Sequence, residues 1–218
     1  MMNDVIALER LNALLPLKQR QDSLSAKRKR IHQRILRSLA LEGVAPTLKQ
    51  LARRVGVSDG LEDALQSLVA QDLIVLSKSG TAVAGAYPMT TEETPHKVNI
   101  SSRSIYAMCA LDAVSIAPMF DVAVTIHSVC RVTGRSIEIQ QDAKGLLNAQ
   151  PSREVKVGIR WQQPGGCAAH SLCTEMVFLK DSVTAGQWQN GDDENISVLS
   201  LDEAISVGKR FFKPLLQD

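Results

Sequence analysis

The first half of the chain places apolar residues at the spacing of an α-helix. Four apolar positions from Val5 to Leu15 predict a first helix, which Pro16 ends or bends because proline cannot continue a helix. The segment 27–41 repeats the pattern, with isoleucine and leucine on one side and basic residues largely around the others. Gly43 is a suitable stop for this second helix.

Two shorter helices and a hairpin are expected next. Thr47 is a suitable cap for a short helix that runs to about Val55, and a further helix is expected over 60–71, after the Gly-Val-Ser turn at 56–58. Short apolar segments on either side of 77–80 then predict a β-hairpin. This order resembles a winged helix-turn-helix.

The second half shows a different period. The polar segment 87–96 holds two prolines, so we expect it to separate a winged-helix-like helical domain, 1–86, from an α+β domain, 87–218. The segment 104–120 predicts one mostly buried helix.

Alternation of apolar and polar residues predicts strands in the rest of this half, at 122–129, 136–140, 155–161, 172–178 and 196–199. Helical patterns return at 182–189 and 202–216. The fold class expected is therefore α+β: an antiparallel sheet flanked by helices, behind the N-terminal winged-helix-like domain.

Composition fits a folded protein of the cytoplasm. The chain has 218 residues, of which 44% are hydrophobic, and this is enough for an ordinary core. No apolar run reaches the roughly 18 residues of a membrane span, and the N-terminus lacks the pattern of a secretory signal. The cysteines are too few for a disulfide framework, so we expect reduced thiols at Cys109, Cys130, Cys167 and Cys173.

Charge is distributed unevenly. Residues 1–60 carry 12 Lys/Arg against 5 Asp/Glu, a balance of +7, whereas the remainder carries 13 against 18. A basic front half is typical of nucleic-acid-binding modules. A DNA reader, however, needs basic residues on its recognition helix, and 60–71 offers Glu62 and Asp63 with no Lys or Arg. The sequence therefore argues against DNA binding.

Cys109 and Asp112 are the first candidates for chemistry. Three residues apart on the expected helix, they lie on nearly the same face, where a carboxylate can exchange a proton with a thiol. Asp112 also interrupts an apolar run, where an unpaired charge is costly. Two structural alternatives stay open: Asp112 bonds backbone groups at the helix end, and Cys109 is a small buried hydrophobe.

The other cysteines and the histidines give weaker signals. Cys173 falls on an expected strand and Cys130 just before a turn, and both suit structural positions. Cys167 follows a Gly-Gly pair six residues before Cys173, so a metal site there is conceivable. No CxxC pair or zinc spacing exists, and no G-x-S-x-G or phosphate-binding glycine loop is present. The histidines without zinc spacing are His32, His96, His127 and His170.

Three short motifs resemble those of organomercurial lyases. Residues 106–112 read YAMCALD, 128–134 read SVCRVTG, and Ser171 precedes Cys173 by two positions. The terminal segment 200–216 is similar to the family's last helix. The resemblance covers about 95–216, and a winged-helix-like front half is also typical of these enzymes.

The resemblance implies a mechanism and its residues. Cys109 would attack mercury first, Cys173 would be the second ligand, and Asp112 would carry the proton and help hold mercuric ion. No organic cofactor or resident metal would be needed, because mercury is substrate and product. Low-molecular-weight thiols would assist product release, and a hand-off to a mercuric ion reductase stays open. Met108 and Thr174 replace residues frequent in the family, a tryptophan and a second cysteine, and Cys167 has no family role.

Two other classes of function compete with this interpretation. The basic, winged-helix-like half fits a transcriptional regulator that senses a soft metal or a small ligand through its thiols. A relative that has lost catalysis and kept a structural role is the second alternative. The intact set of two cysteines and one aspartate speaks against it.

Overall fold

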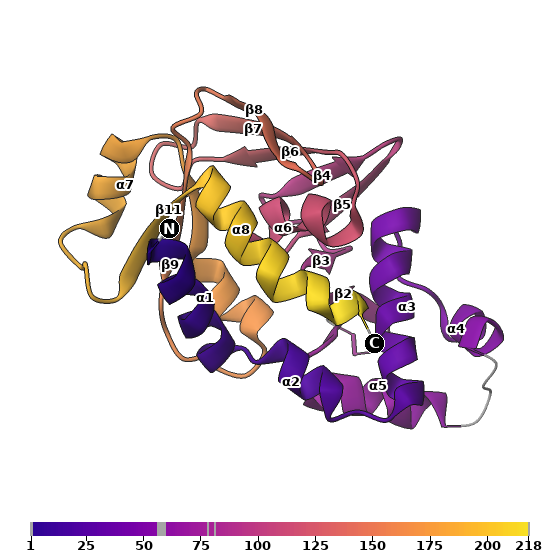
Figure 1. Ribbon diagram of the computed structural model, residues 1–218. Helices are drawn as coiled ribbons and strands as arrows, with labels where there is room; N and C mark the ends of the chain where they lie inside the picture. Colours follow the sequence, from indigo (N-terminus) through magenta and orange to yellow (C-terminus); the bar gives the residue numbers. More distant parts are fainter. Residues whose placement is uncertain (1, 56–59, 78, 81, 218) are drawn as a thin grey trace.

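The fold is built around one large antiparallel sheet (Figure 1). The computed structural model describes residues 2–55, 60–77, 79–80 and 82–217, so the turn expected at 56–58 lies outside the described residues. Eight strands pair in the order β1-β2-β3-β5-β4-β6-β7-β8. Their bounds are β1 Val75–Leu76, β2 Val83–Ala86, β3 Met89–Thr90, β4 Lys97–Ile100, β5 Arg103–Ala107, β6 Val124–Val129, β7 Ser136–Asp142 and β8 Gly145–Gln150.

A second, three-stranded antiparallel sheet lies to one side, with helix α7 against it (Figure 1). Its order is β10-β9-β11, with bounds Met176–Leu179, Lys156–Arg160 and Ile196–Ser200. Helix α7, Ser182–Gln189, begins with a capping box in which Asp181 and Thr184 bond each other's backbone N–H groups. Three 3₁₀ helices complete this half: η1 Ala168–His170, η2 Leu172–Glu175 and η3 Lys213–Leu216.

Helices α6 and α8 form the centre of the molecule. Helix α6, Ala110–Phe120, contacts β5, β6 and β7 on one side and α8, Leu201–Phe212, on the other. The two helices approach so closely that a Cβ added at Gly208 would lie 1.9 Å from Ser115 Oγ. Nearly all of α6 is therefore buried, and its first turn lies deep in the protein.

The front helices pack on both parts of the chain. Figure 1 shows α1 beside α8 and β11, and the C-terminus beside α3. Helix α3 contacts β2, β3 and β5 of the large sheet. Thr47 caps α4 as the sequence predicts, and Gln50 completes a capping box, because each residue bonds the other's backbone N–H. The bounds are α1 Met2–Leu14, α2 Leu17–Asp22, α3 Ala26–Glu42, α4 Leu48–Val55 and α5 Leu61–Ala70.

Several expectations are confirmed. The fold is α+β with antiparallel sheets and helices, and the strands expected at 122–129, 136–140, 155–161 and 196–199 are β6, β7, β9 and β11. The hairpin around 77–80 is the β1–β2 pair, with Lys78 outside the described residues.

Two expectations are wrong. The segment 104–120 is not one helix, because β5 occupies 103–107 and pairs with β3 and β4 before α6 begins. The segment 172–178 is not one strand, because η2 covers its first four residues and β10 starts only at Met176. Both differences change the setting of a cysteine: Cys109 is the N-cap of α6 rather than a residue inside a helix, and Cys173 lies in the 3₁₀ helix η2 rather than in a strand.

The segment 87–96 differs from the polar linker that the sequence predicts. Tyr87 and Met89 are buried, and β3 pairs with β2 on one side and β5 on the other. The large sheet and the main hydrophobic core thus run through this segment without a break. The division into 1–86 and 87–218 stays a prediction. None of the helices that the structure describes is both long and apolar enough to cross a bilayer.

Candidate active site

Cys109 sits where β5 gives way to α6. Its backbone is extended, with φ −154° and ψ 179°, and it is the N-cap of α6. Its Sγ accepts a hydrogen bond from the backbone N–H of Asp112 at 3.3 Å. A thiol at this place does the work of the usual serine or aspartate cap, and the helix N-terminus favours its anionic form.

The structure brings the three predicted site residues together. One ligand atom from each of Cys109, Asp112 and Cys173 lies within 4.8 Å of the other two. Their exposed fractions are 0%, 2% and 3%, so all three are buried. Asp112 comes from the first turn of α6, and η2 brings Cys173 to it from far along the chain.

Burial keeps these groups protonated. It raises the pKa of Asp112 to about 8, although the contact with Cys109 acts in the opposite direction. Burial, with Cys173 and Asp112 close by, raises the pKa of the Cys109 thiol well above its usual value. For Cys173 the contact with Cys109 lowers the pKa, but burial and the Asp112 charge together raise it more. The resting site therefore holds a neutral acid and two thiols near pH 7.

The Asp112 carboxyl is not fully hydrogen-bonded. Its Oδ2 atom is buried and has no hydrogen-bond partner among the residues that the structure describes. A buried oxygen without a partner is costly in a purely structural role. Beside two thiols, the Asp112 carboxyl is placed to accept or deliver a proton, which argues against the interpretation of Asp112 as a simple helix-end residue.

A cavity of about 310 Å³ leads to Cys173. Its walls are mostly apolar and include Met108, Val129, Met176 and Phe178. His96 also lines it; burial lowers its pKa to about 4, and its Nδ1 lies 2.8 Å from Ser128 Oγ, so this imidazole is neutral at pH 7. The charged side chains of the wall are Glu93 and Arg131. A cavity of this kind suits an uncharged organic group whose reactive end meets a thiol.

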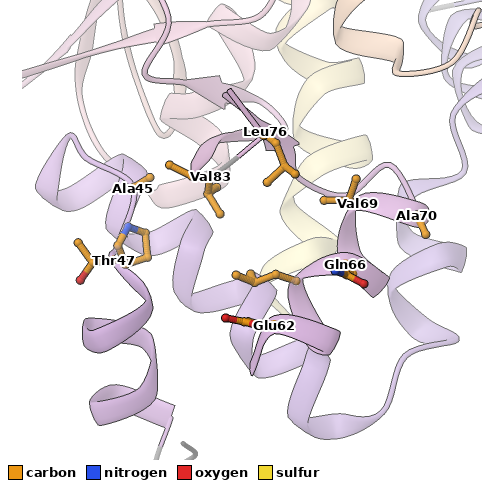
Figure 2. A pocket seen from close by; sticks show the side chains of 12 residues that line it. Ala45, Thr47, Glu62, Gln66, Val69, Ala70, Leu76 and Val83 are labelled. Carbon is orange, nitrogen blue, oxygen red and sulfur yellow. The ribbon is translucent and has the colours of Figure 1, made fainter. Parts of the chain in front are cut away.

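A larger pocket lies in the front half and has no link to these residues (Figure 2). It measures about 620 Å³ and lies between the segment 45–47, α5 and the β1–β2 hairpin. Among its described lining residues Glu62 alone is charged, beside apolar side chains such as Leu76, Val69 and Val83. It contains no cysteine, so we assign the chemistry to the smaller cavity.

The two other cysteines lie outside the cluster. Cys167 is half-buried, with Sγ 3.5 Å from the hydroxyl of Tyr87, which itself donates to Asp72 at 3.0 Å. Cys130 is buried at the start of a turn, where its N–H donates to the carbonyl of Arg135.

Sequence reasoning missed one residue of the site. Met176 Sδ lies 3.6 Å from Cys109 Sγ. No sequence pattern distinguishes this methionine from the other apolar residues of β10, because only the fold places it against the thiol.

Two buried thiols beside a protonated carboxyl, with a mostly apolar cavity that reaches Cys173, define a protein that handles a soft metal bonded to an organic group. The family follows from comparison. The family model described as alkylmercury lyase (MerB) matches residues 89–213, and the chain belongs to this family.

Individual relatives agree with the family model. A curated alkylmercury lyase from Staphylococcus epidermidis is 27% identical over 175 residues, which cover 80% of this chain and 78% of that protein. Another from Bacillus cereus is 25% identical over 168 residues, covering 77% and 74%. The crystal structure of the mercury-bound form of MerB2 matches with a TM-score of 0.76 at 21% identity, covers 91% of this chain and 98% of that one, and has the same fold.

Proposed function

We propose that this protein is an organomercurial lyase, which breaks a carbon–mercury bond by protonolysis. The products are a hydrocarbon and a mercuric ion held by two cysteine thiolates. The observation that carries the proposal is the convergence of Cys109, Asp112 and Cys173 within 4.8 Å in a buried site. Family membership supports the substrate class.

The first step is exchange at mercury. Thiolate sulfur is the soft ligand that mercury prefers. Cys109 forms a sulfur–mercury bond, the ligand that accompanied the organomercury cation leaves, and the thiol proton leaves with it. The N–H of Asp112, already bonded to Cys109 Sγ, favours the anionic sulfur.

The second step breaks the carbon–mercury bond. Cys173 adds to mercury and pushes electron density onto the bonded carbon. Asp112 gives its proton to that carbon and receives the proton that Cys173 loses, so the carboxyl ends the cycle as it began. A pKa of about 8 suits this role, since a general acid works best when its pKa lies near the working pH.

Mercury is substrate and product here, and the mechanism uses no organic cofactor and no resident metal. Release then requires a competing soft ligand, and we assign this to low-molecular-weight thiols of a reducing cytoplasm. Direct transfer of mercuric ion to a mercuric ion reductase is compatible with the same chemistry.

For the front half we propose a winged-helix-like module with a structural role. The order α3, α4, α5 and the β1–β2 hairpin supports the winged-helix interpretation. Two observations favour a structural role over DNA binding. The first turn of α5 is acidic, with Glu62 and Asp63, and α3 contacts three strands of the large sheet. This weakens the alternative of a metal-sensing transcriptional regulator.

Single substitutions test the proposed roles. Cys109→Ser and Cys173→Ser should each abolish hydrocarbon release, because a hydroxyl is a hard ligand that binds mercury poorly. Asp112→Ala should keep organomercury binding and lower the rate by about 10²-fold or more, the usual scale for a lost general acid.

Cys130→Ser and Cys167→Ser are the matched controls, and they should affect stability alone. Hydrocarbon release from phenylmercury, followed by gas chromatography, separates these outcomes. Normal turnover in Asp112→Ala would remove the proton-carrier role, and an inactive Cys167→Ser would show that the wrong second thiol had been chosen.

A further inference from the structure

Met176 lies beside the two site cysteines and has no role in the mechanism proposed above. It is the first residue of β10 and follows η2, which carries Cys173, without a gap. It is 2% exposed and lines the cavity that leads to Cys173. Its Sδ lies 3.6 Å from Cys109 Sγ, within the range of a sulfur hydrogen bond.

The direction of this contact follows from chemistry. A thioether has no proton to give, so Cys109 is the donor and Met176 Sδ the acceptor. The other contact of this sulfur, with the N–H of Asp112, uses a lone pair of Cys109. Met176 Sδ is therefore one acceptor for the thiol proton, beside the Cys173 sulfur and the Asp112 carboxyl, which also contact Cys109.

We propose that Met176 is a third soft ligand to mercury in this site, an inference that rests on the proposed function. When mercury binds Cys109, it replaces the thiol proton, and the thioether sulfur is one of the atoms that accepted that proton. Thioethers are soft donors that suit soft metals. The lone pair that accepted the S–H is then directed at the metal.

The added contact needs no further proton or electron. The thioether donates a lone pair and stays neutral, so two thiolates still balance the charge of the mercuric ion. Its effect on the reaction is to add electron density to mercury in step with Cys173 and to hold the product ion. The unpartnered Oδ2 of Asp112 lies in the same cluster and keeps its role as proton carrier.

A core-packing role predicts something different. Leucine fills nearly the volume of methionine, so Met176→Leu keeps the packing and removes the sulfur alone. Met119→Leu is the matched control: Met119 is equally buried, but it lies near the C-terminal end of α6. A ligand role predicts weaker mercury binding in Met176→Leu and no such loss in Met119→Leu.

The test uses the full chain labelled with [methyl-¹³C]methionine and titrated with mercuric chloride. The methyl signal that Met176→Leu deletes should shift on addition of one equivalent, and the Met119 signal should stay in place. In competition with a small dithiol, Met176→Leu should lose mercury about tenfold more readily than the native chain, as is usual when a supporting metal contact is removed. Met119→Leu should retain mercury like the native chain.

An unmoved Met176 signal, or native mercury retention by Met176→Leu, would overturn the proposal. Mercury X-ray absorption gives an independent reading that needs no variant at position 176. In a Cys167→Ser background, which excludes the other nearby thiol, a third sulfur beside two thiolates is expected, and two sulfurs alone would contradict it.

The proposed function is judged separately. Hydrocarbon release by the native chain tests lyase activity, whereas the methyl shift tests the ligand with inorganic mercury. Release without a shift defeats the inference alone, and no release from the native chain defeats the function whatever Met176 does.

Discussion

Asp112 is a carboxyl group kept neutral by its surroundings. It lies 2% exposed in the first turn of a buried helix, with one oxygen unpartnered and two thiols beside it. The thiols supply little compensation for a negative charge, so burial dominates and raises the pKa to about 8. Both the chemistry and the stability of the protein should depend on this one proton.

Turnover should fall as pH rises through about 8, because the carboxyl that delivers a proton to carbon must be protonated. A single-turnover rate of hydrocarbon release, measured from pH 6 to 10 with phenylmercury already bound, gives the profile. We expect a plateau on the acid side and a descending limb on the alkaline side. A rate that rises steadily through pH 9 would show that the Asp112 proton is not the one delivered.

Stability should respond to the same group. The pKa of Asp112 is raised on folding from 3.8 to about 8, so the folded state holds the proton more tightly. Its contribution is therefore present at acid pH and is lost as pH rises through this window. Asp112→Asn removes the titration, so we expect it to melt at least about 2–4 °C above the native chain at pH 9, which corresponds to about 1 kcal/mol for this size.

At pH 5 the folded carboxyl is still protonated but the unfolded one is already ionised, so the difference between the two melting temperatures should be smaller than at pH 9, and it should vanish only below pH 3.8. Calorimetry at the two pH values makes the comparison, and an equal difference at both would mean that the carboxyl does not titrate in this range.

At the residue scale, the sequence predicted that Cys109, Asp112 and Cys173 form one site, but it did not predict the elements that carry them or the contact with Met176. The neighbourhood of Cys109 and Asp112 follows from their spacing, and the burial of Asp112 from the apolar run around it. The arrival of Cys173 came from the family resemblance, since no local pattern connects it with α6. Met176 was missed because contact between residues of different elements leaves no trace in the periodicity of either one.

Among the elements, the pair α6 and α8 has the tightest constraint. The close approach of the two helices needs a residue without Cβ at 208, because Ser115 occupies that space. Since α6 carries Asp112 and is capped by Cys109, this contact also holds the reactive end of the helix in place.

Gly208→Ala should destabilise the protein by about 1–3 kcal/mol, the usual effect of overpacking a buried contact. Gly186→Ala in α7 is the matched control, because an added Cβ there meets nothing within 4 Å and alanine favours a helix. Urea unfolding should thus move in opposite directions for the two variants. Equal stability of Gly208→Ala and the native chain would show that the helices can separate at no cost.

Elements with a long regular pattern were predicted best. Helix α3 has 17 residues with a clear apolar face, and its predicted range agrees closely with the observed one. Strand β3 has two residues and β4 four, which is too short for alternation to be recognised. At 104–120, four of the five residues of β5 were included in the pattern of the longer helix that follows.

Across the whole molecule, distant parts of the chain are joined by buried polar contacts. Gln21 in α2 donates to the carbonyl of Leu215, and its amide also meets His32 Nδ1 at 2.9 Å. Asp72 accepts from Tyr87 and from the N–H of Ala168, near the cysteine-bearing 3₁₀ turns. The contacts of Gln21 with Leu215 and of Asp72 with Ala168 could not be predicted from the sequence, because their partners lie 194 and 96 residues apart.

We therefore expect the front half to stabilise the fold and not to bind DNA. Its basic residues include several already engaged, such as Lys18 and Lys29 with Asp22. We expect no sequence-selective duplex binding at about 150 mM salt, where nonspecific attraction of a basic patch fades. Fluorescence anisotropy with random and genomic duplexes measures this, and tight selective binding would return the regulator to consideration.

One measurement tests the central claim most directly: a single turnover of phenylmercury by the native chain without free thiol. Two thiols and one carboxyl in a closed site should release one benzene per chain and retain one mercuric ion, with excess small thiol needed only for a second turnover. Phenylmercury that stays bound with its carbon–mercury bond intact, and no benzene, would contradict the account.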